Sequence, residues 1–409
     1  MRKNSHFSGQ PLYGQLIKLL DKSKILDFSR KNGGERYTKR FNCWIHLTVM
    51  LYAVIMRFDS LCEITVSLLA EMRKLAHPGI TFKIGRSTLA DANKRRPEVI
   101  FESIYRDLYA TYRHTLSPDS RSRKTPKWMK RLQIIDSTTI TLFSNLLFKG
   151  VGRHPKTGKK KGGLKVHTVI HANEGVPSDI KFTSAATNDS FMLKPATLSK
   201  GDIMAMDRAY IDYEKFQQLT ERGVIYVTRM KKNLKYRILS DTMYQTSDGL
   251  MEVRIQHMEF VRYLKGKDAI HYKSRIITYV DVRKRRLISL LTNDMESDPE
   301  EIIAIYRQRW EIELLFKQMK QNFPLKYFYG ESANAIKIQI RVTLIANLLL
   351  MVMRKGLKRQ WSFSGLATMV RITLMYYVDF NSLFNNPEKD WKIILSEASG
   401  APPEPSLFD

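Results

Sequence analysis

The chain is poor in cysteine. Its 409 residues include only Cys43 and Cys62, which are too few and too isolated for a disulfide framework or a cysteine-rich zinc site. We therefore expect a protein of the reducing cytoplasm.

Long apolar runs are also missing. The N-terminal sequence MRKNSHFSGQ carries basic residues with no apolar segment or small-residue cleavage site after them, which argues against a signal peptide. The most apolar run, Cys43 to Met56, is interrupted by His46 and falls short of the roughly 18 apolar residues of a membrane span. We expect a buried core helix there and no membrane association.

Acidic residues are scarce relative to basic ones. The chain has 68 Lys and Arg against 40 Asp and Glu, a net charge of +28, while its hydrophobic fraction of 43% is that of a globular protein. A folded protein with this charge is expected to bind a polyanion, with nucleic acid ahead of an anionic membrane surface. The length suits two or three domains.

The first 115 residues or so have a helical pattern, and no strand alternation competes with it. Within them the segment GRSTLADANKRR, residues 85–96, predicts a short helix with Ser87 as its N-cap and Lys94, Arg95 and Arg96 at its end. Such a helix could face DNA. Basic residues that complement the negative end of a helix dipole explain the pattern about equally well.

A linker and a change of pattern follow. Residues 115–127 are rich in Ser, Pro and basic side chains, a composition typical of a linker. Strand-like runs then occupy residues 131–143, 164–172 and 201–210, and shorter ones continue from 224 to 291. Helical periodicity returns near residue 299, and the Pro-rich tail, residues 399–409, is expected to be disordered.

One predicted helix carries a line of polar residues. Tyr306, Arg309, Glu313 and Lys320 are spaced by 3, 4 and 7 positions, so at about 100° per residue they share one face. A charged stripe is usually a solvated surface. Here, however, apolar residues lie on both sides of the line, which favours a functional face.

Two acidic residues interrupt or follow apolar strands. Asp136 lies in QIIDSTTI and Asp207 directly follows DIMAM. Carboxylates at such positions are costly unless they are paired or hold a metal. Together with Glu313 they form an all-oxygen set that suits Mg²⁺ or Mn²⁺ better than zinc.

The Y-x(2)-R-x(3)-E-x(6)-K pattern of Tyr306, Arg309, Glu313 and Lys320 resembles the signature of the insertion sequence four family of bacterial DDE transposases. The segments IDSTT and MDRAYIDY resemble that family's first and second Asp segments, and the order Asp, Asp, Glu agrees. One departure is Ala209, where the family more often has Gly. The likeness covers roughly residues 130–345.

The resemblance implies a fold and a chemistry. It implies an α/β protein with a ribonuclease H-like catalytic core, a β-rich insertion and an all-α N-terminal domain. Asp136, Asp207 and Glu313 would be catalytic and would hold Mg²⁺ or Mn²⁺, as two ions. Tyr306, Arg309 and Lys320 would contact double-stranded DNA, both the terminal inverted repeats and the target, with the protein as a homodimer in a synaptic complex at the bacterial nucleoid.

The expected domains follow from the same reading. They are a helical DNA-binding domain with its linker at 1–128, a catalytic domain at 129–223 and 292–345, the β-rich insertion at 224–291, and a helical C-terminal segment and tail at 346–409. Besides a transposase that cuts and joins DNA, two functions remain open. One is a metal nuclease without strand joining, and the other is a noncatalytic transposase-derived DNA-binding protein.

Two other patterns are weaker. The segment from Gly152 to Lys165 has neither the glycine spacing nor the Ser or Thr of a phosphate-binding loop; its lysines either touch the DNA backbone or are merely solvated. The clusters at 229–235 and 283–286 could grip DNA or keep turns soluble.

Overall fold

The computed structural model describes residues 9–117, 125–141, 163–172, 174–231, 233–247, 249, 251–263, 269–281 and 285–389. Five segments without a predicted secondary structure lie wholly or partly outside these ranges: the linker at 115–127, the segment 152–165, the basic clusters at 229–235 and 283–286, and the tail at 399–409.

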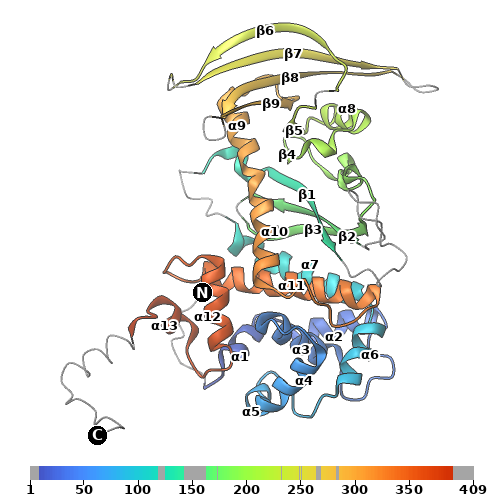
Figure 1. The fold of residues 1–409 in the computed structure, drawn as a ribbon, viewed down its shortest axis with the longest axis vertical. Helices are drawn as coiled ribbons and strands as arrows, with labels where there is room; N and C mark the ends of the chain where they lie inside the picture. The colour runs from blue at the N-terminus through green and yellow to red at the C-terminus, as the bar shows by residue number, and fades with distance from the viewer. Residues whose placement is uncertain are drawn as a thin grey trace, which may run out of the picture.

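All regular elements described before residue 117 are helices (Figure 1). They are α1 (Leu12–Ile17), α2 (Lys22–Lys31), α3 (Cys43–Met56), α4 (Leu61–Ala70), α5 (Met72–Leu75), α6 (Arg86–Arg95) and α7 (Glu98–Leu116). The expected buried helix is confirmed in α3, in which every residue from Cys43 to Ile55 is buried. It begins where the Asn42 side chain accepts a hydrogen bond from the Ile45 amide, an ordinary N-cap.

The start of α6 differs from the sequence prediction. Gly85, not Ser87, is the N-cap, and the helix begins at Arg86. Ser87 lies in the first turn with its side chain exposed. A Ser near a helix start is a good N-cap only if its own backbone is extended, and here the extended residue is Gly85.

The strands form one nine-stranded sheet in the order β3-β2-β1-β4-β5-β9-β8-β7-β6. Their bounds are β1 (Leu132–Thr141), β2 (Gly163–His171), β3 (Pro177–Ser184), β4 (Ile203–Met206), β5 (Ile225–Arg229), β6 (Arg237–Gln245), β7 (Glu252–Arg262), β8 (Ile270–Asp281) and β9 (Arg286–Thr292). The segments predicted as strands from their apolar runs each contain a strand, but the one predicted at 201–210 ends at Met206, and Arg208–Tyr210 form a 3-10 helix. No apolar run in the sequence marked β3. β6 is exposed along nearly its whole length and therefore has no alternation of apolar and polar residues.

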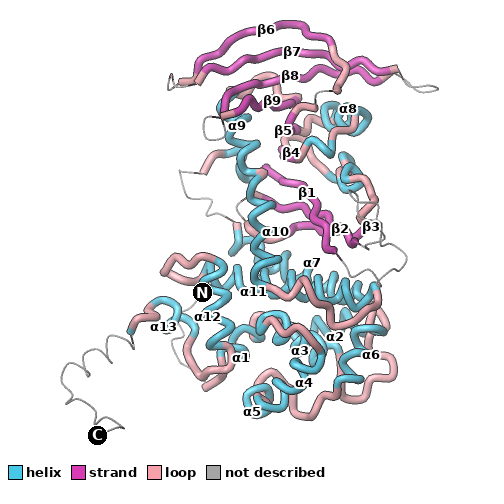
Figure 2. The backbone as a smooth tube through the Cα atoms, in the orientation of Figure 1, coloured by secondary structure: helices cyan, strands magenta, loops and turns pink. Residues whose placement is uncertain are grey.

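The centre of the sheet is parallel and its flanks are antiparallel. β1, β4 and β5 run parallel, and the other neighbours are antiparallel. Strands β3, β2, β1, β4 and β5 form one half of the sheet, and strands β9, β8, β7 and β6 extend the other half away from the N-terminal helices (Figure 2). β5 joins the two halves because it pairs with both β4 and β9.

Short helical segments connect the central strands. They are η1 (Lys127–Lys130), η2 (Asp189–Met192), η3 (Pro195–Thr197), η4 (Arg208–Tyr210) and α8 (Tyr213–Glu221). After the sheet come α9 (Pro299–Gln308), α10 (Trp310–Asn322), α11 (Ala333–Lys355), α12 (Phe363–Thr373) and α13 (Phe380–Asn385). The polar line therefore spans two helices, which meet at Arg309.

Helix α11 links the C-terminal part to the N-terminal helices. It packs against α3 and α7 (Figure 1), and it runs across residue 345, where the sequence suggested a boundary. It is the one helix among the described residues that is long and apolar enough to cross a membrane, but 94% of its apolar window is buried inside the protein. Its apolar character is therefore explained by the core.

Candidate active site

Parallel pairing of β1 and β4 brings two aspartates together. Ile135 of β1 is paired with Met206 of β4, and Asp136 and Asp207 are the next residue of each strand. The register of the pair therefore puts Asp136, which lies within β1, beside Asp207, which directly follows the last residue of β4. Asp207 also begins η4, where its side chain accepts a hydrogen bond from the Ala209 amide at 3.0 Å. Ala209 does not have a positive φ, so the backbone there does not require Gly.

Helix α10 packs against β1 and carries the third acid. Glu313 lies in its first turn, one turn after Arg309. The Arg309 guanidinium contacts two acids at once: Nη1 is 3.4 Å from Asp136 Oδ2, and Nη2 is 2.5 Å from Glu313 Oε1. The arginine thus lies between the strand carboxylate and the helix carboxylate.

The electrostatics of Asp136 reflect this crowding. Burial raises the pKa of its carboxyl to about 6, and the charges of Asp207 and Glu313 act in the same direction. The Ser137 amide, which donates to Asp136 Oδ1 at 2.8 Å, and the Arg309 guanidinium oppose the rise. Three carboxylates close enough to interact need a counter-charge to ionise together.

The remaining residues of the polar line lie at different depths. Lys320 donates from Nζ to Thr138 Oγ1 on β1 at 2.8 Å, and burial lowers the pKa of its ammonium group. Tyr306 is only 8% exposed. Its hydroxyl has no hydrogen-bond partner among the described residues, and its ring centroid is 5.7 Å from Arg309 Cζ.

A cleft opens beside these groups. Its volume is about 830 Å³, and Asp136, Glu313 and Lys320 lie in its wall. Arg57 and Asp59, which follow α3, also line this cleft. Tyr306 and Asp207 are not among the lining residues. Trp310 and Leu314, two of the apolar residues beside the polar line, are 51% and 50% exposed.

Sequence reasoning missed a fourth carboxylate near the site. Asp189, in η2, accepts a hydrogen bond from Ser137 Oγ at 2.5 Å and lies 3.2 Å from Lys165 Nζ. The only local signal is the preceding Asn188, which caps the turn. No strand or helix periodicity marks such a loop residue.

The donor set fits a hard divalent cation. Asp136, Asp207 and Glu313 offer only carboxylate oxygens, which suit Mg²⁺ and Mn²⁺. Among the described residues, however, no three His, Cys, Asp or Glu side chains converge closely enough to hold an ion, and the Arg309 guanidinium lies between Asp136 and Glu313. A positive charge is thus already accommodated between two of the three acids.

Comparisons with known families agree with the geometry. Residues 127–349 match the family described as Transposase DDE domain, and residues 8–81 match a domain of unknown function, DUF4372. The first match contains β1 to β9, α9, α10 and all the acids described above.

Three relatives show the same relationship. A protein of Sinorhizobium fredii named as transposase y4zB is 29% identical over 268 residues, 66% of this chain and 71% of the relative. The protein named as a transposase of IS5377 from Geobacillus stearothermophilus is 26% identical over 60% of this chain and 62% of its own length. The protein named as a transposase of IS4SA from a Synechocystis strain is also 26% identical, over 64% of this chain and 70% of its own length. A piggyBac transposase in a synaptic complex with hairpin DNA has a TM-score of 0.46 at 11% identity, covering all of this chain and 88% of that one.

The family model spans more than half of the chain and includes the strand aspartates and the helix glutamate. The protein therefore belongs to the DDE transposase family, which cleaves DNA and transfers strands with divalent metal ions.

Proposed function

We propose that Asp136, Asp207 and Glu313 are the catalytic acids of this transposase. The observation that carries the proposal is that Asp136 in β1 lies beside the end of β4 and is joined through Arg309 to Glu313 in the first turn of α10. The three carboxylates would hold two Mg²⁺ or Mn²⁺ ions. Such ions activate a water or a DNA 3′-hydroxyl and neutralise the leaving oxygen in an in-line displacement.

Three residues of the protein would then position the DNA strand. Arg309 would turn from the carboxylates to a phosphate near the scissile bond, where its fork can make two hydrogen bonds. Lys320, at the cleft wall, would contact a neighbouring phosphate. The buried Tyr306 ring would support Arg309 from below and offer its hydroxyl to the DNA.

The finer classification also belongs to this proposal. The Tyr306, Arg309, Glu313 and Lys320 spacing supports the Y-R-E-K branch of the insertion sequence four family. A five-strand half with order β3-β2-β1-β4-β5, three of its strands parallel, supports a ribonuclease H-like core. We assign that core to residues 129–223 and 292–345, the insertion to 224–291, the helical DNA-binding domain to 1–128 and the C-terminal segment to 346–409.

The biological setting is inferred from the family. We propose that the protein binds the terminal inverted repeats of its own element and a target duplex, works as a homodimer in the synaptic complex, and resides in the bacterial cytoplasm at the nucleoid. The net charge of +28 supports a DNA partner.

The decisive experiment uses Glu313→Gln, which keeps the shape of the side chain and removes its charge. With Mg²⁺ and duplexes from the borders of the element, the wild type should nick the ends and join precleaved ends to a plasmid. The variant should lose both reactions by at least a factor of about 100. Equal activity of the variant would refute the assignment. Nicking by the wild type without joining would instead indicate a nuclease.

A matched control is Glu311→Gln. Glu311 lies in the same turn of α10 but is not among the residues that line the cleft. Its loss of charge should leave both reactions within about twofold of the wild type, which separates a general charge effect from loss of a catalytic acid.

A further inference from the structure

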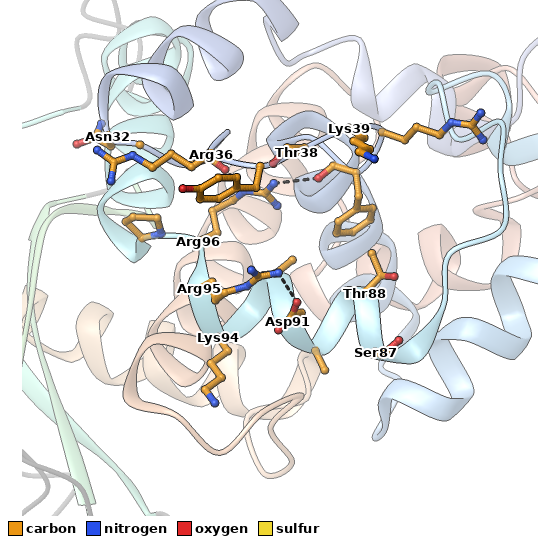
Figure 3. A pocket seen from close by; sticks show the side chains of 18 of the residues that line it. Asn32, Arg36, Thr38, Lys39, Ser87, Thr88, Asp91, Lys94, Arg95 and Arg96 are labelled. Carbon is orange, nitrogen blue, oxygen red and sulfur yellow. Dashed lines mark hydrogen bonds and ion pairs between the residues drawn. The ribbon is translucent and has the colours of Figure 1, made fainter.

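A groove lined by basic residues lies among the N-terminal helices, apart from the cleft that contains Asp136 and Glu313. Its volume is about 1710 Å³, and it lies between the segment Lys31–Phe41, which follows α2, and the helix α6 (Figure 3). No catalytic acid lines it. The family model for the DDE domain begins at residue 127 and does not include it.

The groove carries a strong excess of positive charge. One acidic side chain, Asp91, lines it, together with seven basic ones: Lys31, Arg36, Lys39, Arg40, Lys94, Arg95 and Arg96. Arg36, Lys39, Arg40 and Lys94 are exposed and make no salt bridge with another described residue. Uncompensated charge along a groove attracts a polyanion.

The basic segment is held in a defined shape by a buried arginine. Arg96 is only 5% exposed; its Nε donates to the Gly34 carbonyl at 3.1 Å and its Nη2 to the Phe41 carbonyl at 2.9 Å. The two contacts fix both ends of the segment above α6 (Figure 3). Between them, Tyr37 has a left-handed backbone with φ of 58° and a side chain that is 98% exposed. The segment is therefore built to present polar and aromatic groups.

Helix α6 offers a polar face to the same groove. Five exposed residues share an arc of about 120° at 100° per residue: Ser87, Thr88, Asp91, Lys94 and Arg95. Leu89 and Asn93 are buried on the opposite side. Asn93 anchors the helix, because its Oδ1 is 2.8 Å from His46 Nε2 and its carbonyl accepts from Asn334.

We propose that this groove binds duplex DNA, with α6 in the major groove and the basic segment on the phosphate backbone. A single helix fits the major groove, which is about 12 Å wide, and short polar side chains at its start commonly contact base edges. Arg36, Lys39 and Arg40 contact phosphates. The Arg95 and Asp91 side chains, paired with each other in the free protein, exchange that pair for guanine and cytosine edges, their usual base partners.

With α6 contacting bases and the basic segment contacting phosphates, the groove would recognise the sequence at the ends of the element. Phosphate contacts position a protein on DNA, whereas contacts to base edges select the sequence. This inference does not depend on the catalytic assignment, because DNA binding is measured in EDTA, where no strand is cut.

The test of base reading is a selection from a pool of 30-base-pair duplexes with random sequence, using the full-length protein in EDTA. The wild type should enrich one motif. Arg95→Gln should change the preference at one position from guanine to adenine, since Gln pairs with adenine as Arg does with guanine. An unchanged motif for both Arg95→Gln and Asp91→Ala would overturn the role of α6.

The test of the phosphate contacts uses the triple variant Arg36→Ala, Lys39→Ala, Arg40→Ala. Its affinity for the selected duplex and for an unrelated duplex should fall by a similar factor. The slope of log affinity against log salt should decrease by roughly 2 to 3. The matched control is Lys358→Ala, Arg359→Ala, Lys389→Ala, which removes the same charge from exposed C-terminal positions and should leave the slope unchanged.

Two results would overturn the groove as a duplex site. One is equal loss of affinity and of slope in the triple variant and the control, which would indicate a diffuse charge effect. The other is loss of binding to anionic vesicles or single-stranded RNA with duplex binding intact. Thermal unfolding at the wild-type temperature establishes that each variant is folded.

Discussion

Arg309 bridges Asp136 and Glu313, with one guanidinium nitrogen 3.4 Å from the strand carboxylate and another 2.5 Å from the helix carboxylate. The bridge connects residues 173 positions apart in the sequence. It holds the first turn of α10 against β1 and supplies the counter-charge that allows the two acids to lie close together.

Removing this arginine should separate metal binding from catalysis. In Arg309→Ala, the carboxylates lose their internal cation, so Mg²⁺ or Mn²⁺ should raise the melting temperature by more than in the wild type. Strand joining should still fall at least tenfold, because the phosphate contact is lost. Thermal unfolding with and without metal, together with a joining assay, measures both effects.

The neighbouring exposed Arg307 gives the control for this prediction. Arg307→Ala should show the wild-type metal shift. A smaller metal shift in Arg309→Ala than in the wild type would mean that the arginine does not compete with a cation.

The ionised carboxylate of Asp136 should destabilise the folded protein at neutral pH. Its folded pKa of about 6 lies above the ordinary value of 3.8, so the folded protein binds the proton more tightly than the unfolded chain. Stability therefore falls as the pH rises from about 4 to 6 and is then constant. Asp136→Asn should abolish joining and raise the free energy of unfolding by about 1 to 3 kcal/mol at pH 7.5, and by less at pH 5.

Urea unfolding at the two pH values measures this difference. Asp27, whose side chain is 44% exposed and pairs with Lys31 on the surface of α2, serves as the control, and Asp27→Asn should change the free energy of unfolding by less than about 0.5 kcal/mol at either pH. A gain for Asp136→Asn that is the same at pH 5 and pH 7.5, or a loss, would contradict the assigned cause.

The role of Lys320 can be separated from that of Thr138. Lys320→Ala should reduce strand joining about tenfold by removing a phosphate contact, and Lys320→Arg should recover part of the activity because the charge returns. Thr138→Val removes only the hydroxyl that orients the ammonium group and should cost less than about threefold. If Thr138→Val is as harmful as Lys320→Ala, the lysine acts through its bond to β1 rather than on DNA. Initial rates of joining decide between the two.

Two substitutions of Tyr306 should distinguish the packing of its ring from a contact between its hydroxyl and DNA. Tyr306→Phe keeps the buried ring and removes a hydroxyl that has no partner among the described residues, so the melting temperature should be unchanged or slightly higher. The hydroxyl is buried and does not line the cleft in the free protein, so a severalfold loss of joining would show that it reaches the DNA in the complex. Tyr306→Ala should destabilise the fold by about 3 to 5 kcal/mol. Full activity of Tyr306→Phe would show that the ring only packs.

Part of the candidate site could be predicted because its signals are local. Asp136 and Asp207 each interrupt or follow an apolar strand, and Glu313 lies in a helical pattern with Tyr306, Arg309 and Lys320. Asp189 could not be found this way, since it lies in a short turn without periodicity. Ser87 was wrongly read as a cap because Gly85 and Ser87 are both acceptable caps and only the backbone angles distinguish them.

By itself the sequence determined the types of element, the excess of positive charge and the order of the three acids, because hydrophobic period and composition are properties of neighbouring residues. The tertiary structure alone decided which strands are parallel neighbours, and hence that Asp136 and Asp207 meet. It also placed Arg309 between two acids and the basic segment 31–41 opposite α6. These arrangements depend on long-range pairing of strands and packing of helices, which no local pattern encodes.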